Sequence, residues 1–470
     1  MSSDEPSEQS TGVAAVILAA GLGTRMRSSL PKELHTICGR PLLQHVIDAA
    51  SAANPDQLIV VLSPAKAAIA ESLPANCEVV WQNDPLGTGH AAAQALPHLK
   101  ADIRQVAVLF GDHPLLTAEA VTDLVDKSCE SQALVTLLTA ILADPGAYGR
   151  VRYERDRIVG VVEAKEDKTA YTAPVEIYSG ISCYERDWLE EKLPTVPRSA
   201  VGEYYLTSLV SLAASDTVRT TPVVSVVAPA ETAYGINDRV ELAAAERLMQ
   251  QRVNERWMRS GVTIVDPAST FIDASVTIGQ DARIEPFTLL SGSTSIGERS
   301  TIGPSAIIRD SSIGHESVVV ASTLESAAIG DRVHVGPYAH FRSGTLIESD
   351  VHVGNYVETK NASIGSGTHV GHFSYLGDTE IGRRVNIAAG TITANYDGQT
   401  KHRTVIEDDA FIGCDTILRA PVTVGASGRT GAGSVVTHDV APGETVVGVP
   451  ARPLARRAET RRDGEKDSQH

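Results

Sequence analysis

A glycine-rich segment followed by two basic residues is the first part of the sequence that could perform chemistry. The segment LAAGLGTRM spans residues 18–26, and Lys32 follows in LPKELH. A glycine-rich turn after a strand lets backbone N–H groups approach phosphate oxygens. The segment lacks the third glycine of the dinucleotide-binding fingerprint and is no Walker A motif. Arg25 and Lys32 therefore favour a polyphosphate ligand, although a solvated helix start would explain the same residues.

An aspartate and a second loop add to this nucleotide-like pattern. Asp112 directly follows the apolar run VAVLF, at the carboxyl end of an expected strand, where open α/β sheets bind ligands. It could hold Mg²⁺ among phosphates, or it could cap the next helix. The loop QNDPLGTGHA, residues 82–91, contains three residues that could contact a nucleobase, namely Gln82, Gly87 and Thr88. Together these features indicate nucleotidyl transfer.

The elements that must position these residues are expected in residues 13–237. Apolar runs such as VAAVILAAG end in glycine or aspartate, as strands buried on both faces do, and helical patterns lie between them. This alternation predicts a Rossmann-like α/β domain with a mostly parallel sheet. Residues 238–260 contain no glycine or proline and predict one helix that links two domains. Residues 1–12 and 449–470 are polar and are expected to be disordered tails.

Residues 261–448 repeat an aliphatic residue every six positions, often followed by glycine. The first series begins at Ile278, Ile284, Leu290, Ile296 and Ile302. A series of this length is typical of a parallel β-helix built from hexapeptides, whose handedness the period alone does not fix. In VGHFSYLGDTEIG, residues 370–382, the repeat loses one position, because Val370 and Ile381 are 11 residues apart instead of 12.

Composition narrows the class of protein further. The 470 residues suffice for two domains or more, and the net charge of −17 leaves no basic surplus for a nucleic-acid partner. The five cysteines are scattered without CxxC spacing, which indicates reduced thiols rather than a disulfide frame or a zinc site. The first residues do not form a signal peptide, and no apolar run reaches transmembrane length. We therefore expect a cytoplasmic protein with no nucleic-acid or membrane partner.

Eight motifs occur in the order found in bacterial sugar-1-phosphate nucleotidylyltransferases. They are LAAGLGTRM, LPKELH, PLGTGHA, FGDHPLL, AYGRV, VVEAKE, GEYYLT and GIND. With the hexapeptide half, the chain resembles the family of bifunctional N-acetylglucosamine-1-phosphate uridylyltransferases/glucosamine-1-phosphate acetyltransferases over residues 14–448. The resemblance implies that the C-terminal half is a left-handed β-helix and that the enzyme is a homotrimer. It also implies two reactions, the acetylation of glucosamine-1-phosphate by acetyl-CoA and the coupling of the product to UTP. The resulting UDP-N-acetylglucosamine would supply peptidoglycan and lipopolysaccharide synthesis.

The resemblance assigns roles in the first site. Arg25 and Lys32 would act on the triphosphate, and Asp112 and Asn237 would hold one or two Mg²⁺ ions. The remaining contacts to UTP and the sugar would come from Leu18, Ala19, Ala20, Gly21, Gln82, Gly87, Thr88, Gly149, Glu163 and Tyr178. Since the attacking sugar phosphate is already anionic, this reaction needs alignment and charge neutralisation rather than a general base.

The resemblance assigns a second site to the β-helix. His372 would be the general base of acetyl transfer, because a neutral imidazole can remove a proton from an amine near neutral pH. Glucosamine-1-phosphate would contact Arg342, Lys360, Tyr375 and Asn386, and acetyl-CoA would contact Ala389, Asn395, Tyr396, Cys414, Ala432 and Val449. With three hexads to a coil, Arg342 and Lys360, 18 residues apart, should stack on one face. We also expect the lost position in 370–382 to turn His372 and Tyr375 toward a substrate.

Three positions depart from the family pattern, and two other interpretations stay open. Tyr178 stands where the family commonly has Asn, and Cys414 and Val449 stand where it often has Ser and Arg. We expect altered affinities with retained activity, and Arg452 could replace a lost phosphate contact. One alternative is a monofunctional sugar-1-phosphate nucleotidylyltransferase whose β-helix only mediates oligomerisation. The other is a regulatory protein similar to certain exchange-factor subunits of translation initiation, which can lack the catalytic groups found here.

Overall fold

The computed structural model describes residues 12–164, 167, 169, 171, 173–199 and 202–454. They belong to two compact units that divide between Met249 and Gln250. The division falls inside α7 (Arg239–Arg259), where the sequence predicts a linking helix. Of the two expected tails, residues 1–11 and 455–470 lie outside the described residues. The short strand β40 (Arg452–Pro453) lies within the second expected tail and pairs with β39 (Thr445–Val447).

The N-terminal unit is built on one nine-stranded sheet with the order β11-β7-β10-β6-β1-β4-β5, and β8 and β9 extend it from β10. Strands β4, β1 and β6 run parallel, whereas β10 runs antiparallel to β6 and β7. The predicted Rossmann-like, mostly parallel sheet is confirmed. The strands span β1 Gly12–Leu18, β4 Gln57–Leu62, β5 Cys77–Trp81, β6 Ile103–Phe110, β7 Val135–Leu142, β8 Gly149–Glu154, β9 Arg157–Val162, β10 Val175–Glu185 and β11 Val223–Ala228, and the separate pair is β2 Thr36–Ile37 and β3 Arg40–Pro41.

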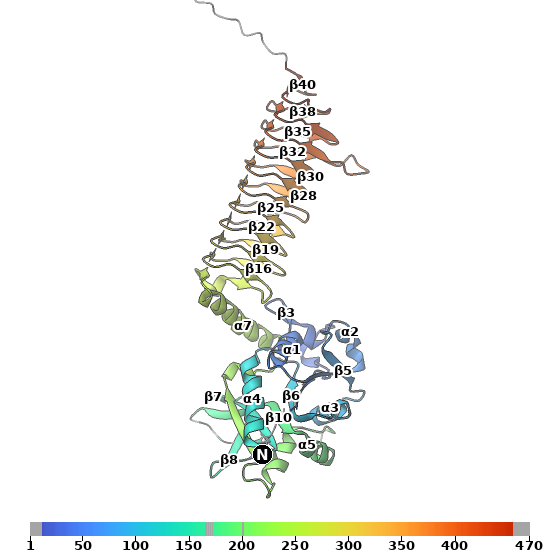
Figure 1. The fold of residues 1–470 in the computed structure, drawn as a ribbon, viewed down its shortest axis with the longest axis vertical. Helices are drawn as coiled ribbons and strands as arrows, with labels where there is room; N and C mark the ends of the chain where they lie inside the picture. The colour runs from blue at the N-terminus through green and yellow to red at the C-terminus, as the bar shows by residue number, and fades with distance from the viewer. Residues whose placement is uncertain are drawn as a thin grey trace, which may run out of the picture. The chain divides into compact units, whose positions relative to one another are not determined.

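Helices cover both faces of this sheet, which is why its central strands are apolar on both sides (Figure 1). Ala15 and Ile17 of β1 share a core with α1 and α4, and Ala14 and Val16 share another with α3, α5 and α6. The helices span α1 Leu42–Ala52, α2 Ala67–Ala70, α3 Thr88–Ala95, α4 Ala118–Ser131, α5 Arg186–Lys192 and α6 Thr207–Ala214. The 3-10 turns span η1 Thr24–Met26, η2 Lys32–Leu34, η3 Pro64–Lys66, η4 Leu96–His98, η5 Leu193–Thr195, η6 Ala230–Ala233 and, in the second unit, η7 Pro267–Ser269. None of the helices among the described residues has both the length and the apolar character of a membrane span.

The C-terminal unit is a stack of short parallel strands, seen in Figure 1 as regular coils from β16 to β38. Two sheets, of 12 and 17 strands, run along the stack, and each strand pairs with the one a coil later. This confirms the expected hexapeptide β-helix and is consistent with a left-handed coil. Its strands up to β26 span β12 Thr263–Ile264, β13 Phe271–Ile272, β14 Thr277–Ile278, β15 Arg283–Ile284, β16 Leu289–Ser291, β17 Ser295–Ile296, β18 Thr301–Ile302, β19 Ile307–Arg309, β20 Ser312–Ile313, β21 Val318–Val319, β22 Thr323–Glu325, β23 Ala328–Ile329, β24 His334–Val335, β25 His340–Phe341 and β26 Leu346–Ile347. The remaining strands before β39 span β27 His352–Val353, β28 Glu358–Ile364, β29 His369–Val370, β30 Tyr375–Ile381, β31 Asn386–Ile387, β32 Ile392–Ala394, β33 Thr404–Ile406, β34 Phe411–Ile412, β35 Ile417–Arg419, β36 Val422–Val424, β37 Arg429–Thr430 and β38 Val435–Val436.

The lost position in the repeat lies in a turn after Tyr375, so the expectation that it falls at His372 and Tyr375 is wrong. Val370 and Leu376 keep the spacing of six, whereas Leu376 and the buried Ile381 are five apart. The shortened turn is made by Asp378, whose backbone is left-handed with φ 48°.

The same shortening recurs in other coils. Asn361, with φ 47°, makes a five-residue turn in β28, one coil earlier. Asp310 and Ser326 occupy equivalent left-handed turns between β19 and β20 and between β22 and β23. A single residue in the left-handed region is sufficient to join two walls, so a short coil is a general property of this β-helix rather than a mark of its site.

Candidate active sites

A cleft of about 570 Å³ opens at the carboxyl ends of β1 and β6. Most residues predicted for the first site line it together, namely Leu18, Ala19, Ala20, Gly21, Arg25, Lys32, Gln82, Gly87, Thr88, Asp112 and Asn237. They come from segments far apart in the sequence, and the parallel strands bring them to one edge of the sheet. This volume suits a small-molecule substrate.

The floor of the cleft is a network of paired charges. Lys32 Nζ lies 2.5 Å from Asp112 Oδ2, and His113 Nδ1 lies 2.9 Å from Asp112 Oδ1. Burial raises the pKa of the Asp112 carboxyl, but the hydrogen bond from His113 and the charges of His113 and Lys32 outweigh it, so this pKa lies well below its ordinary value. Arg25 Nη2 donates to Asn237 Oδ1 at 2.7 Å. Asp112 is thus held ionised. His113 was not predicted from the sequence, because a residue next to Asp112 forms no spaced motif with it.

The donors at this floor fit Mg²⁺. Asp112 and Asn237 both line the cleft, and Ile236, the residue before Asn237, donates from its N to Asp112 O at 2.9 Å. Mg²⁺ is commonly bound through one or two protein oxygens, with water and substrate phosphates completing the shell. In the part of the chain that the structure describes, no cluster of three or more His, Cys, Asp or Glu could hold a metal by itself. A metal here would therefore need water or phosphate oxygens as further ligands.

The second loop forms the opposite part of the cleft. Gln82 is buried, and its amide nitrogen lies 3.0 Å from His90 Nδ1 and 3.3 Å from Gly87 O, so the side chain is fixed. Gly87 has φ 96°, and a Cβ there would come within 2.7 Å of Tyr204 O. Thr88 Oγ1 accepts a hydrogen bond from Leu206 N. The loop is therefore rigid, and glycine is required where it passes the backbone of Tyr204.

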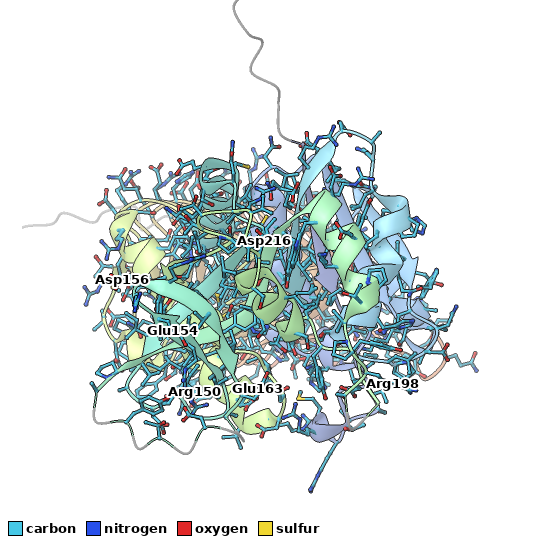
Figure 2. All side chains as sticks on the ribbon, turned by 90° about the horizontal axis from the view of Figure 1, so that it is seen from below. Arg150, Glu154, Asp156, Glu163, Arg198 and Asp216 are labelled. Carbon is cyan, nitrogen blue, oxygen red and sulfur yellow. The ribbon has the colours of Figure 1, made fainter. Side chains whose placement is uncertain are left out.

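Three predicted residues do not line this cleft. Gly149 is the first residue of β8, and the exposed Glu163 directly follows β9. Val162, the residue before Glu163, pairs with Arg150 of β8; Arg150 and Glu163 are labelled in Figure 2. Tyr178 is buried inside the sheet, where its hydroxyl donates to Gly180 O at 2.7 Å. Burial raises the pKa of Tyr178 to about 12. The roles of these three residues in sugar binding stay predictions.

Three cations gather on the β-helix. Arg342 N donates to Thr359 O, so Arg342 and Lys360 lie on adjacent coils as the spacing of 18 predicts. Arg342 Nη1 lies 3.1 Å from Glu358 Oε1. The charge of Lys401 and then that of Arg342 lower the pKa of Lys360. Lys401, in the loop after β32, was not singled out from the sequence, because an insertion between repeats has no fixed register.

His372 lies in the turn between β29 and β30 and is exposed. Its Nδ1 is hydrogen-bonded to Asn355 Oδ1, one coil earlier. Because an amide oxygen only accepts, Nδ1 carries the hydrogen and Nε2 is the unprotonated nitrogen of the neutral ring. Sequence reasoning missed Asn355, although its distance of 17 residues from His372, about one coil, could have identified it.

The predicted acetyl-CoA contacts extend from His372 along one edge of the β-helix. Gly390 N donates to His372 O, Asp415 N donates to Ala389 O, and Gly433 N donates to Cys414 O, so the turns of successive coils stack. Ala389, Cys414 and Ala432 thus belong to the same edge. Asn386 begins β31 on the adjoining wall, where it pairs with His369.

The loop after β32 holds two more predicted contacts. Asn395 Nδ2 donates to Asp378 Oδ2 at 2.5 Å, and Tyr396 is exposed and bridges to Lys401. Tyr375, half-buried at the start of β30, lies beside Asn395, because a Cβ on Gly377 would meet Tyr375 Oη and would come within 2.8 Å of Asn395 Nδ2. Val449 is exposed beyond β39.

Comparisons with known proteins find a matching domain model and two relatives that are similar over most of the chain. Residues 15–153 match the model of the MobA-like NTP transferase domain. The chain is 42% identical over 428 residues to the "Bifunctional protein GlmU" of Halalkalibacterium halodurans, with 91% of this chain and 94% of that protein covered. It is 43% identical over 430 residues to the protein of the same name from Desulfitobacterium hafniense, with the same coverage. A solved CMP:2-keto-3-deoxy-manno-octonic acid synthetase complexed with CTP covers 51% of this chain, and 99% of its own, at 21% identity and a TM-score of 0.41.

Proposed function

The chain belongs to the family of bifunctional GlmU proteins, and on that premise we propose a role for each residue of its two sites. It is an enzyme with uridylyltransferase and acetyltransferase activities, and the monofunctional interpretation is set aside. Its substrates include a nucleotide and acetyl-CoA. The cleft, with Arg25, Lys32 and Asp112 on one floor, is the observation that carries the assignment of uridylyl transfer to the N-terminal unit.

In uridylyl transfer, a phosphate oxygen of N-acetylglucosamine-1-phosphate forms a bond to the α-phosphorus of UTP, and the bond to the β-phosphate oxygen breaks to release pyrophosphate. Arg25 and Lys32 bind the triphosphate and reduce the repulsion between two anions. Gln82 and Thr88 hold the base, and the rigid loop around Gly87 fixes its position. Mg²⁺, held by Asp112 and Asn237, would supply further neutralisation of phosphate charge.

In acetyl transfer, His372 Nε2 takes a proton from the ammonium group of glucosamine-1-phosphate. The amine then forms a bond to the carbonyl carbon of acetyl-CoA and its nitrogen loses a second proton. The carbon–sulfur bond breaks to leave the coenzyme A thiolate, which takes up a proton. Arg342, Lys360 and Lys401 bind the sugar phosphate. A backbone N–H group near Ala389 stabilises the oxyanion, with the acetyl-CoA extended along the edge that contains Cys414 and Ala432.

We also propose that the acetyltransferase site is completed in a homotrimer. An aromatic edge, defined by Tyr338, Tyr356 and Phe373, continues from His372; neighbouring rings stack with centroids 5.3 Å apart, and each side chain is more than half exposed. Stacked exposed aromatics are typical of surfaces covered by another chain. The cytoplasm, where these substrates and peptidoglycan precursors are made, is the proposed location.

A mass-spectrometric assay with substrates omitted in turn tests the proposed function. Glucosamine-1-phosphate, acetyl-CoA, UTP and Mg²⁺ together should give UDP-N-acetylglucosamine, and omission of UTP should leave N-acetylglucosamine-1-phosphate. Without acetyl-CoA, nucleotide sugar should form only from supplied N-acetylglucosamine-1-phosphate. A protein that couples supplied N-acetylglucosamine-1-phosphate but never acetylates would contradict the second activity.

A further inference from the structure

A buried ion pair that the mechanism does not use lies under the glycine-rich loop. Lys66, the last residue of η3, is 5% exposed, and Glu33 of η2 is 2% exposed. Lys66 Nζ lies 2.7 Å from Glu33 Oε1. Lysine and glutamate are almost never fully buried unless they are paired, because removing a charge from water is costly. The groups that this pair binds should therefore explain why it is buried here.

The Lys66 ammonium also binds the loop itself. It donates to Ala19 O at 2.8 Å and to Gly21 O, and with the ion pair these bonds occupy its three N–H groups. In a trans peptide the C=O and N–H groups point in opposite directions. Fixing these two carbonyls toward Lys66 therefore turns the N–H groups of Ala20 and Leu22 away from it. The loop and Glu33 line the cleft and Lys66 does not, so those N–H groups are directed to the cleft side.

The partner carboxylate connects the loop to the cations of the cleft. Glu33 directly follows Lys32, whose Nζ contacts Asp112. Through Glu33, Lys66 joins the loop after β1 to the turn that carries Lys32. Burial lowers the pKa of Lys66, and the charge of Glu33 opposes this shift. The Lys66 ammonium group therefore connects the two segments that face a triphosphate, the glycine-rich loop and the turn that carries Lys32.

We propose that Lys66, paired with Glu33, is a positioning residue for uridylyl transfer that keeps the N–H groups of the glycine-rich loop directed at the triphosphate. The inference rests on the proposed function, since it takes UTP as the ligand of this cleft. Lys66 acts through the loop and does not touch the nucleotide. Its loss should therefore weaken UTP binding and leave binding of the sugar phosphate nearly unchanged.

Steady-state kinetics of the full-length protein test this role. Lys66→Met keeps an unbranched side chain without the charge, and the KM for UTP should rise about tenfold while the KM for N-acetylglucosamine-1-phosphate changes less than about twofold. Lys66→Arg should restore most of the UTP affinity. Lys100→Met is the matched control, because Lys100 is exposed and donates to Asp56 O away from the cleft. Acetyl transfer, measured on the same samples, should be unchanged in all variants.

A Lys66→Met protein that is folded by circular dichroism and has a normal KM for UTP overturns the proposal. If that variant does not fold, the double variant Glu33→Gln with Lys66→Met, which buries no charge, is compared with Glu33→Gln alone, because Glu33 lines the cleft. An equal KM for UTP in these two proteins overturns the proposal. The dissociation constant of UTP with Mg²⁺, from calorimetric titration, repeats the comparison without turnover. A wild-type protein that binds UTP but forms no nucleotide sugar would contradict the proposed function and leave the binding comparison valid.

Discussion

The cleft of the N-terminal unit and the edge of the β-helix both gather cations, but the lysines of the cleft are paired with carboxylates, whereas of the three cations gathered on the β-helix only Arg342 has such a partner in the described part of the chain, Glu358. In the cleft, Lys32 contacts Asp112 and Lys66 contacts Glu33, and all four side chains are mostly buried. On the β-helix, the charges that most affect Lys360 are those of two other cations, Lys401 and Arg342. Within the described residues, Lys360 and Lys401 form no ion pair.

This difference follows from burial. Buried charges need partners because the interior solvates them poorly, so a cleft that binds phosphates must be built with its carboxylates already in place. Water and salt screen the repulsion between exposed cations, so a surface site needs no carboxylates of its own before it binds an anion. The first site is therefore prepared by its own chain, whereas the second is exposed to its ligand.

Among the variants that test this comparison of the two sites, Lys32→Met should change activity most. The change leaves Asp112 without its cation and removes a phosphate contact, so kcat/KM for uridylyl transfer should fall about 10²–10³-fold. The hydrogen bond and charge of His113, and after them the charge of Lys32, hold the pKa of Asp112 down. The loss of Lys32 should raise that pKa, so the remaining activity should disappear at a higher pH as the solution is acidified.

Initial rates across pH check this prediction, with Lys192→Met as the control, because Lys192 is a partly exposed lysine of α5 that does not line the cleft. An unshifted acid limb would mean that Lys32 does not govern the ionisation of Asp112.

A smaller effect is expected from Lys401→Ala on the β-helix. The KM for glucosamine-1-phosphate should rise about tenfold, and the difference from wild type should shrink at high salt, because exposed charges are screened. The charges of Lys401 and Arg342 lower the pKa of Lys360, so in wild type phosphate affinity should be lost as pH rises through that lowered pKa. In the variant this loss should move to higher pH.

The control for the cation cluster is Arg299→Ala, which removes an exposed cation paired with Glu316 in another part of the β-helix. Arg299→Ala should leave the KM for glucosamine-1-phosphate unchanged. An equal effect of the two variants would indicate general attraction by the surface rather than a phosphate site.

The smallest effect is expected from Asn355. Asn355→Ala removes the acceptor that fixes His372 Nδ1–H, so kcat for acetyl transfer should fall about threefold to tenfold with little change in either KM. Asn355→Asp keeps an acceptor and adds a negative charge beside the imidazole, so the pH profile of acetyl transfer should shift to higher pH. The two pH–rate profiles measure this, and superimposable profiles for wild type and Asn355→Asp would exclude the contact.

The sequence predicts the architecture well, because its periods reflect burial directly. The apolar runs before Gly21 and Asp112 become buried central strands, and the hexapeptide series becomes the stacked coils. Residues at strand ends were brought together as expected, since parallel strands present their carboxyl ends at one edge. Arg342 and Lys360 fall on adjacent coils because their spacing matches one coil.

What the sequence could not give depends on single side chains and turns. Lys66 and Glu33 are 33 residues apart without a repeat to relate them, so their pairing is visible only in three dimensions. The hydroxyl of Tyr178 is directed into the sheet by Gly180, which periodicity cannot indicate. The position of the shortened turn at Asp378 was predicted wrongly, because the aliphatic repeat shows which residues are buried and does not show where the turn between them lies.

The most direct test of the division into two sites is a reciprocal assay of His372→Ala and Asp112→Ala. We expect His372→Ala to lose acetyl transfer about 10²–10⁴-fold and to couple supplied N-acetylglucosamine-1-phosphate to UTP at the wild-type rate. Asp112→Ala should acetylate normally and form almost no nucleotide sugar. A mixture of the two variants should again convert glucosamine-1-phosphate to UDP-N-acetylglucosamine. Loss of both activities in either folded variant would contradict the account.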